Sequence, residues 1–282
     1  MSEAVFPPEI EHVIFLNALA LKENGESPIN LILVAKRVHS WLMPQIMKTF
    51  ALSTLPPVQK YPFPWDIHTL HTHGKHVRNL FIWKSDHHTP NLGSLASHLI
   101  SLCPHITDLV LWSKGSSLSR IELEQISRLE HLTHLSINLS KVPKSAWEKP
   151  EFAQAFSRIT HLENVADIRS HEDLIIFKHF TSITHLAISG CEQDTLLLLF
   201  TRLPTLEVLI VWEVDDHDTL MVVDQFNPHE DDPRIVRVAC AVGGELDAWL
   251  SEVQKGQGMW GLADQAVGER KKLKEASRKG TN

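Results

Sequence analysis

A six-residue pattern recurs along most of the chain and constrains its fold more than any other feature. Each copy has an apolar residue, two variable residues, an apolar residue, one variable residue and a final residue that is apolar in every copy but the fourth, where it is Asn164. The seven copies are VRNLFI (77–82), ITDLVL (106–111), LTHLSI (132–137), ITHLEN (159–164), ITHLAI (183–188), LEVLIV (206–211) and IVRVAC (235–240). Because apolar and variable positions alternate at the end of each copy, each copy predicts a short strand with one buried face.

The segments between the copies predict helices. Leu95, Leu99 and Leu102 recur at helical spacing before the second copy, and Ile126 and Leu129 do so before the third. Short strands that alternate with helices are typical of a parallel sheet with crossover helices.

The spacing of the copies narrows this prediction. Successive copies begin 23 to 29 residues apart, which falls in the period of about 20–29 residues that leucine-rich repeats show. We therefore predict an α/β fold: a short leucine-rich-repeat-like solenoid of parallel strands and crossover helices, in which each unit buries its apolar face against its neighbours. The alternative is an ordinary α/β domain with parallel strands.

Three regions are predicted. Residues 1–65 lack the pattern and predict a small helical module, residues 66–242 the solenoid, and residues 243–282 a C-terminal helical cap with a basic polar tail. Pro7 and Pro8, followed by Glu9 and Glu11, are typical of a helix start. The acidic stretch 213–232 predicts a long loop. The basic tail indicates either an anionic partner or localisation signal, or a solvated helix end.

The N-terminal residues resemble a known family. Residues 7–10 (PPEI), 33–38 (LVAKRV) and 41–44 (WLMP) resemble the F-box of fungal F-box-like proteins with degenerate leucine-rich-type repeats. Residues 247–249 (DAW) and the glycine-rich stretch up to Trp260 resemble the closing segment of those proteins. The resemblance implies a substrate-recognition adaptor, in which the F-box docks on the linker subunit of a cullin-based ubiquitin ligase and the repeats hold a protein client.

The resemblance also implies which residues make the docking contact. The positions carried over are Pro8, Ile10, Leu33, Val34 and Trp41. The same apolar helix faces would suit the N-terminal cap of a solenoid. A non-catalytic scaffold with a vestigial F-box that serves only as a cap is therefore the alternative function.

Strand alternation predicts a client-binding strip on the concave face of the sheet. Its residues are Asn79, Phe81, Asp108, Val110, His134, Ser136, His161, Glu163, His185, Ala187, Val208 and Ile210. His134, His161 and His185 share one position in three consecutive copies and predict a straight row across adjacent strands, about 4.8 Å apart. Such a row does not converge on one metal ion.

The row has two interpretations. Imidazole titrates near pH 6.5, so the row predicts a polar strip that becomes cationic as the pH falls. Otherwise Thr-His-Leu is merely a sequence that an exposed strand tolerates. Trp83, Trp112 and Trp212 also share a position, just after their copies. They predict either interface anchors or side chains buried under the loops.

No catalytic motif is present, and we expect neither an enzyme nor a cofactor. The chain lacks a phosphate-binding loop, a dinucleotide fingerprint, H-E-x-x-H, G-x-S-x-G and C-x-x-C. Histidines crowd residues 68–88, at His68, His71, His73, His76, His87 and His88. A metal-dependent hydrolase that uses this window is a remote alternative, and polar loop histidines are the simpler interpretation. Residues 215–218 (DDHD) predict either a divalent-ion site or a solvated loop.

Composition limits the partners further. A net charge of −7 argues against nucleic acid as a partner. No apolar run reaches the roughly 18 residues of a membrane span, so no membrane partner is expected. Three scattered cysteines predict a reducing, intracellular location, either cytoplasmic or nuclear.

Overall fold

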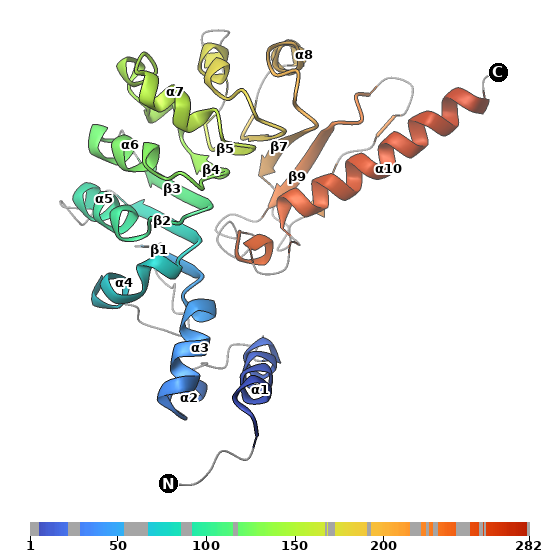
Figure 1. Cartoon of the computed structure of the whole chain (residues 1–282). Helices are drawn as coiled ribbons and strands as arrows, with labels where there is room; N and C mark the ends of the chain where they lie inside the picture. Colours follow the sequence, from blue (N-terminus) through green and yellow to red (C-terminus); the bar gives the residue numbers. More distant parts are fainter. Residues whose placement is uncertain are drawn as a thin grey trace.

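A single nine-stranded sheet organises the part of the chain that the structure describes (Figure 1). The computed structural model describes residues 6–21, 29–53, 67–85, 92–114, 118–166, 168, 173–190, 193–214, 221–223, 226–227, 231–240, 249–253, 256 and 258–280. The strand order is β1-β2-β3-β4-β5-β6-β7-β9-β8. The strands are parallel except for β8, which pairs antiparallel with β9. This confirms the predicted α/β class with a parallel sheet.

The strand boundaries follow the six-residue copies closely. The strands are β1 (Thr49–Ser53), β2 (Asn79–Ser85), β3 (Asp108–Lys114), β4 (His134–Ile137), β5 (His161–Asn164), β6 (His185–Ile188), β7 (Val208–Val214), β8 (Met221–Val222) and β9 (Ile235–Cys240). Each of the seven copies contributes one strand. Two strands lie outside the copies: β1, in the segment expected to be helical, and β8, in the segment expected to be a loop.

Helices join consecutive strands and cover one face of the sheet. The α-helices are α1 (Pro8–Leu21), α2 (Ile29–Ile32), α3 (Lys36–Ile46), α4 (Ile67–His73), α5 (Leu92–Leu102), α6 (Arg120–Ser127), α7 (Pro150–Phe156), α8 (Gln193–Arg202) and α10 (Met259–Gly280). Short 3-10 helices are η1 (Gly74–His76), η2 (Leu139–Lys141), η3 (Lys144–Ala146) and η4 (Asp173–His179). Figure 1 shows α4 to α8 along one face, and the start of α10 on the opposite side. None of the described helices is long and apolar enough to cross a membrane.

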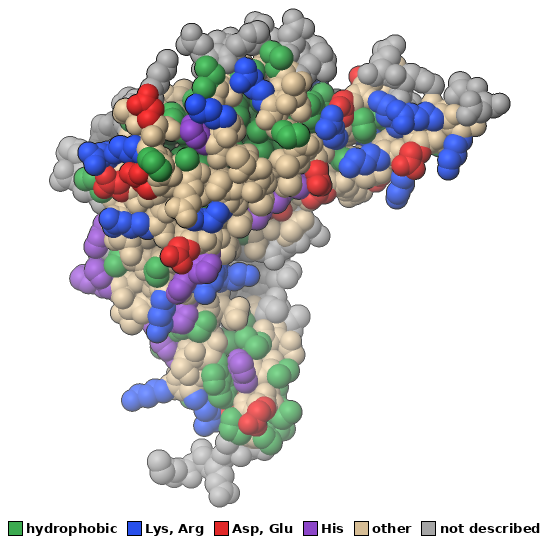
Figure 2. All heavy atoms as spheres, turned by 45° about the horizontal axis from the view of Figure 1, so that its top comes forward, with side chains coloured by type: hydrophobic (Ala, Val, Ile, Leu, Met, Phe, Trp, Pro, Cys, Tyr) green, Lys and Arg blue, Asp and Glu red, His purple; other side chains and the backbone are tan. Residues whose placement is uncertain are grey.

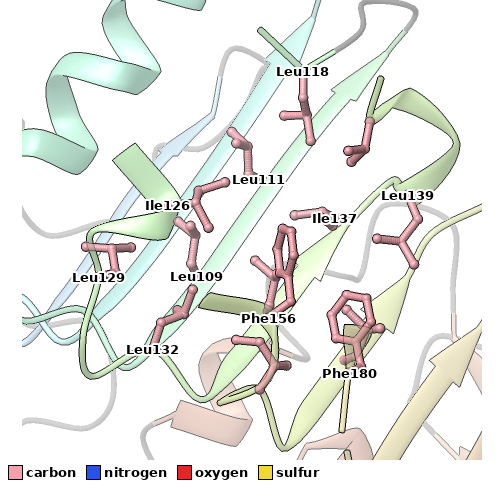
Figure 3. Packing of buried hydrophobic residues seen from close by; sticks show 14 of the residues in the cluster. Leu109, Leu111, Leu118, Ile126, Leu129, Leu132, Ile137, Leu139, Phe156 and Phe180 are labelled. Carbon is pink, nitrogen blue, oxygen red and sulfur yellow. The ribbon is translucent and has the colours of Figure 1, made fainter. Parts of the chain in front are cut away.

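The main core lies between the sheet and these helices (Figure 3). Leu109 and Leu111 of β3 are buried there with Ile126 of α6, and Phe156 and Phe180 continue the core across the next units. The first turn of α6 is fixed by a capping box, in which Ser119 and Glu122 satisfy each other's backbone N–H groups. The apolar residues that recur at helical spacing therefore form the helix face that packs against the sheet.

Gly74 marks a close contact between two units. A Cβ atom at this position would lie 2.3 Å from the carbonyl oxygen of Leu102, at the end of α5. Only glycine allows this approach, which sets the spacing between the start of β2 and the following helix.

Different helices pack at the two ends of the sheet. At the N-terminal end, α3 buries Val38, Leu42 and Met43. At the C-terminal end, α10 packs Ala263 and Val267 in a second core that it shares with strands β6, β7 and β9. Beyond that contact, α10 extends past the sheet with basic side chains along it (Figure 2).

Candidate functional site

The predicted strip residues share one face of the sheet in two straight rows. Strand pairing aligns the first row as Asn79, Asp108, His134, His161, His185 and Val208. It aligns the second row as Phe81, Val110, Ser136, Glu163, Ala187 and Ile210. These twelve residues therefore lie together on the face of the sheet opposite the main core. We call it the strip face.

The strip face is not open, which corrects the expectation that it is an exposed surface. Nine of the twelve residues are buried: Asn79, Phe81, Val110, Ser136, Glu163, His185, Ala187, Val208 and Ile210. Asp108, His134 and His161 are half-buried. The physical reason is that the C-terminal part of the same chain packs over these strands.

Two tryptophans anchor this covering segment, which we define as residues 249–253 and 258–267. Trp249 lies 5.3 Å from Phe81 between ring centroids, and its indole Nε1 donates a 2.8 Å hydrogen bond to Asp108 Oδ1. Trp260 meets the rings of His161 and His185 edge-on, at 5.3 and 5.8 Å.

Polar contacts fix the same segment at two further points. The carboxylate of Asp264 lies 3.0 Å from Nε2 of His185. Because a carboxylate can only accept, His185 carries a proton on this nitrogen. Glu252 accepts from the backbone N–H of Trp260 at 3.0 Å, which ties the two halves of the covering segment together.

The histidine row forms a stacked ladder. The ring centroids of His134 and His161 are 4.0 Å apart, and those of His161 and His185 are 4.1 Å apart. Burial first, and neighbouring imidazoles second, lower the pKa of His134 to about 4 and that of His161 to about 2. The prediction that the row becomes cationic in mildly acidic solution is therefore wrong for these two residues.

A threonine ladder supports the histidine ladder, and the sequence analysis missed it. Each histidine Nδ1 lies 2.8–3.0 Å from the hydroxyl of the threonine before it, at Thr133, Thr160 and Thr184. Each of these hydroxyls also donates to the carbonyl of the equivalent threonine one strand earlier, at 3.2–3.4 Å. The signal was in the sequence, since Thr precedes the strip position in four successive copies.

Carboxyl groups and indoles form a second network beside the ladder. Ser136 donates a 2.5 Å hydrogen bond to Glu163, and Trp112 donates one of 2.6 Å to Ser136. Trp212 donates to the other oxygen of Glu163 at 3.1 Å. Burial raises the pKa of Asp108 to about 7, against the opposing effect of its Trp249 hydrogen bond.

The shared-register tryptophans lie beside the covering segment. Trp83 and Trp112 face each other across β2 and β3, with ring centroids 5.2 Å apart. Trp112 is buried, whereas Trp83 and Trp212 are half-buried. Trp249 and Val165, which follows β5, pack with Trp83 and Trp112, so the covering segment contributes to their burial.

A small cavity remains between the strip face and the covering segment. The cavity has a volume of about 40 Å³. Its lining consists of Asp108, Val110, Trp112, His134, Leu135, Ser136, His161, Glu163, Trp212, Trp249, Glu252, Met259 and Trp260. Trp249, Glu252, Met259 and Trp260 were not among the predicted site residues or tryptophans, because nothing periodic connects them to the strands, and Leu135 was expected to face only the core.

The candidate docking residues lie together at the opposite end of the molecule. Pro8 and Ile10 are exposed at the start of α1, and Leu33 and Val34 are exposed between α2 and α3. Trp41 is half-buried, with its ring 5.1 Å from that of His12. Figure 2 shows hydrophobic side chains gathered at this end.

The histidine-rich window forms no recognisable metal site in the described part of the chain. His68, His71 and His73 lie on α4 and His76 on η1. Rings approach in pairs, such as His73 and His76 at 6.3 Å, and no group of three or more metal-ligating side chains is found among the described residues. His87, His88 and residues 215–218 lie outside the described residues.

No protein-family model and no curated protein matches the chain. The apolar surface of the N-terminal helices and the covered strip face are the two features of the described residues that bear on its function.

Proposed function

We propose that this chain is a short leucine-rich-type solenoid with an F-box-like end, and that it works as the substrate-recognition adaptor of a cullin-based ubiquitin ligase. The observation that carries the proposal is the apolar surface of the N-terminal helices. Leu33 and Val34 are 74% and 61% exposed, and Ile10, Val13 and Ile14 expose 46–54% of their surface. Contiguous exposed apolar side chains of this kind mark interaction sites.

The exposed surface is distinct from the face that closes the sheet. A cap alone needs an apolar inner face and a polar outer face. The inner face belongs to α3, which buries Val38, Leu42 and Met43. The outer face, formed by α1 and residues 33–34, is apolar instead of polar, and this favours a docking surface for the ligase linker subunit over a cap alone.

The covered strip face favours a second candidate function. A client that binds there has to replace the covering segment, since nine of the twelve strip residues are buried. A scaffold that uses its F-box-like end only as a cap needs no such exchange. The two candidates differ in whether the chain recruits the linker subunit.

The test is co-purification of the linker subunit with the full-length chain and with the double variant Leu33→Asp, Val34→Asp. We expect the wild type to capture the subunit and the double variant to lose it, with an unchanged melting temperature, because both side chains are exposed. Ile121→Asp is the matched control, since Ile121 is 60% exposed on α6, away from the N-terminal helices. Absence of the subunit from the wild-type preparation, or its retention by the double variant, would favour the scaffold.

A further inference from the structure

The cavity under the covering segment has aromatic walls from both sides. Trp112 and Trp212 come from the sheet, and Trp249 and Trp260 come from the covering segment. Four indoles therefore surround one small space.

The indole N–H groups of three of these residues are already engaged. Trp112 donates to Ser136, Trp212 to Glu163 and Trp249 to Asp108. A ligand in the cavity would therefore meet these tryptophans through their rings, and not through their hydrogen-bond donors. Rings of this kind attract cations through their quadrupole, and tryptophan does so best.

The remaining titratable groups of the cavity are acidic. Asp108, Glu163 and Glu252 line it, and no lysine or arginine is found among the described residues of the lining. Burial raises the pKa of Glu252 and raises that of Asp108 to about 7, so the negative charge of Asp108 is complete only above pH 7. The two histidines in the lining stay neutral near pH 7, because burial lowers the pKa of both. Glu163 is only 8% exposed and accepts hydrogen bonds from the Ser136 hydroxyl and the Trp212 indole, which hold its carboxylate in place.

The size of the cavity limits what can enter. A single water needs roughly 10–15 Å³, and the cavity offers about 40 Å³. That suffices for a compact head group, and it is far below the roughly 300–1,000 Å³ of pockets for larger ligands.

From these observations we propose that the cavity binds a quaternary ammonium group through cation–π contacts with the tryptophans and through the charge of the neighbouring carboxylates. Such a group has no N–H donors to satisfy, and it suits walls that offer rings and negative charge. Choline and a trimethylated lysine side chain carry the same head group. The site is independent of the proposed adaptor function.

The first test uses the full-length chain and small probes. Titration calorimetry and tryptophan fluorescence should detect choline, and should show binding about tenfold weaker for dimethylbutanol, its uncharged carbon isostere. Equal binding of the two probes, or no binding of choline at millimolar concentration, would overturn the proposal. A lysine-containing peptide, with and without trimethylation, separates the two sources: preference for the modified peptide over choline assigns the site to a protein partner, and the reverse preference assigns it to a small molecule.

The second test changes the charge of the covering segment. Glu252→Gln keeps the shape of the side chain and should weaken choline binding about fivefold to tenfold. Glu275→Gln is the matched control, because Glu275 is exposed on the same helical C-terminal region but does not line the cavity. Unchanged affinity in a folded Glu252→Gln protein would contradict a role for this carboxylate. If this variant fails to fold, the comparison of choline with dimethylbutanol on the wild type decides the proposal alone.

Discussion

Trp249 and Asp108 are joined by a 2.8 Å hydrogen bond although 141 residues separate them in the sequence. The bond connects the covering segment to the third strand of the sheet, and Trp249 also packs on Phe81 of the second strand. The C-terminal part of the chain is therefore tied to the N-terminal half of the sheet. This contact holds the covering segment on the strip face at β2 and β3, whereas Trp260 and Asp264 hold it at β5 and β6.

Trp249→Phe tests that contact. The change keeps an aromatic ring on Phe81 but removes the indole donor, so we expect the free energy of unfolding to fall by about 1 kcal/mol. Amide hydrogen exchange in the covering segment should accelerate more than exchange in β4 and β5. Asp108→Asn is the control, since its amide oxygen still accepts from Trp249. Equal acceleration throughout the sheet would show that the tryptophan acts on global stability and not on the cover.

Gly261 provides a second way to loosen the covering segment. A Cβ atom there would lie 2.3 Å from the carbonyl oxygen of Gly256, so Gly261→Ala has to displace the turn before α10. Gly268 lies on the same helix, with no atom within 4 Å of the position a Cβ would take. We expect Gly268→Ala to stabilise the protein by about 0.5–1 kcal/mol, because alanine is the better helix former.

Gly261→Ala should have the opposite sign. We expect a lower urea midpoint and greater exposure of Trp249 and Trp260 to a soluble fluorescence quencher. Equal stabilisation by both alanine variants would mean that the turn around Gly256 shifts without cost, and would remove the argument for a rigid cover.

The sequence predicted the sheet well because its signal is periodic. Each copy places its apolar residues two apart, and this alternation fixes which side chains face the core, as with Leu135 and Ile137. The same alternation put His134, His161 and His185 in one row. Met47, Phe50 and Leu52 have the same spacing and pack in the main core, so β1 (Thr49–Ser53) is an eighth copy of the pattern that was overlooked in the N-terminal segment.

The covering segment was missed for a different reason. Whether a strand face is open depends on what packs on it, and the partner here lies beyond the last copy. Nothing in the spacing of Trp249 or Trp260 indicates contact with Asp108 or His161. The lowered pKa values of His134 and His161 follow from burial under that cover, so their neutral state could not be predicted from the sequence either.

The histidine ladder should make the protein less stable in acid. The unfolded chain takes up protons on these histidines near pH 6.5, whereas folded His134 does so only near pH 4 and folded His161 near pH 2. Their contribution to stability is thus fully present above pH 6.5 and is lost as the pH falls, down to about 4 for His134 and about 2 for His161. Urea unfolding at several pH values should show this slope, and His134→Gln should reduce it. An unchanged slope would mean that other titratable groups dominate the acid dependence.

Asp108 should produce the opposite trend. Its pKa is about 7 in the folded chain and near 3.9 when unfolded, so its contribution is present below pH 4 and is lost as the pH rises through 7. Glu252 acts in the same direction, because burial raises its pKa as well. Asp108→Asn should therefore raise the free energy of unfolding more at pH 8 than at pH 5. A gain that does not depend on pH would show that the carboxyl group does not titrate in this range.

Gly74→Ala tests how tightly consecutive units are spaced. The added methyl group would meet the backbone carbonyl of Leu102 at 2.3 Å, and backbone cannot give way as a flexible side chain can. We expect a loss of about 1–3 kcal/mol, the usual cost of overpacking, measured by urea unfolding. Thr72→Ala is the control, since Thr72 is exposed on the neighbouring helix and makes only a 3.4 Å contact with the carbonyl of His68. A loss no larger than that of the control would show that the start of β2 can move away from α5, and that the spacing of these units is not fixed by glycine.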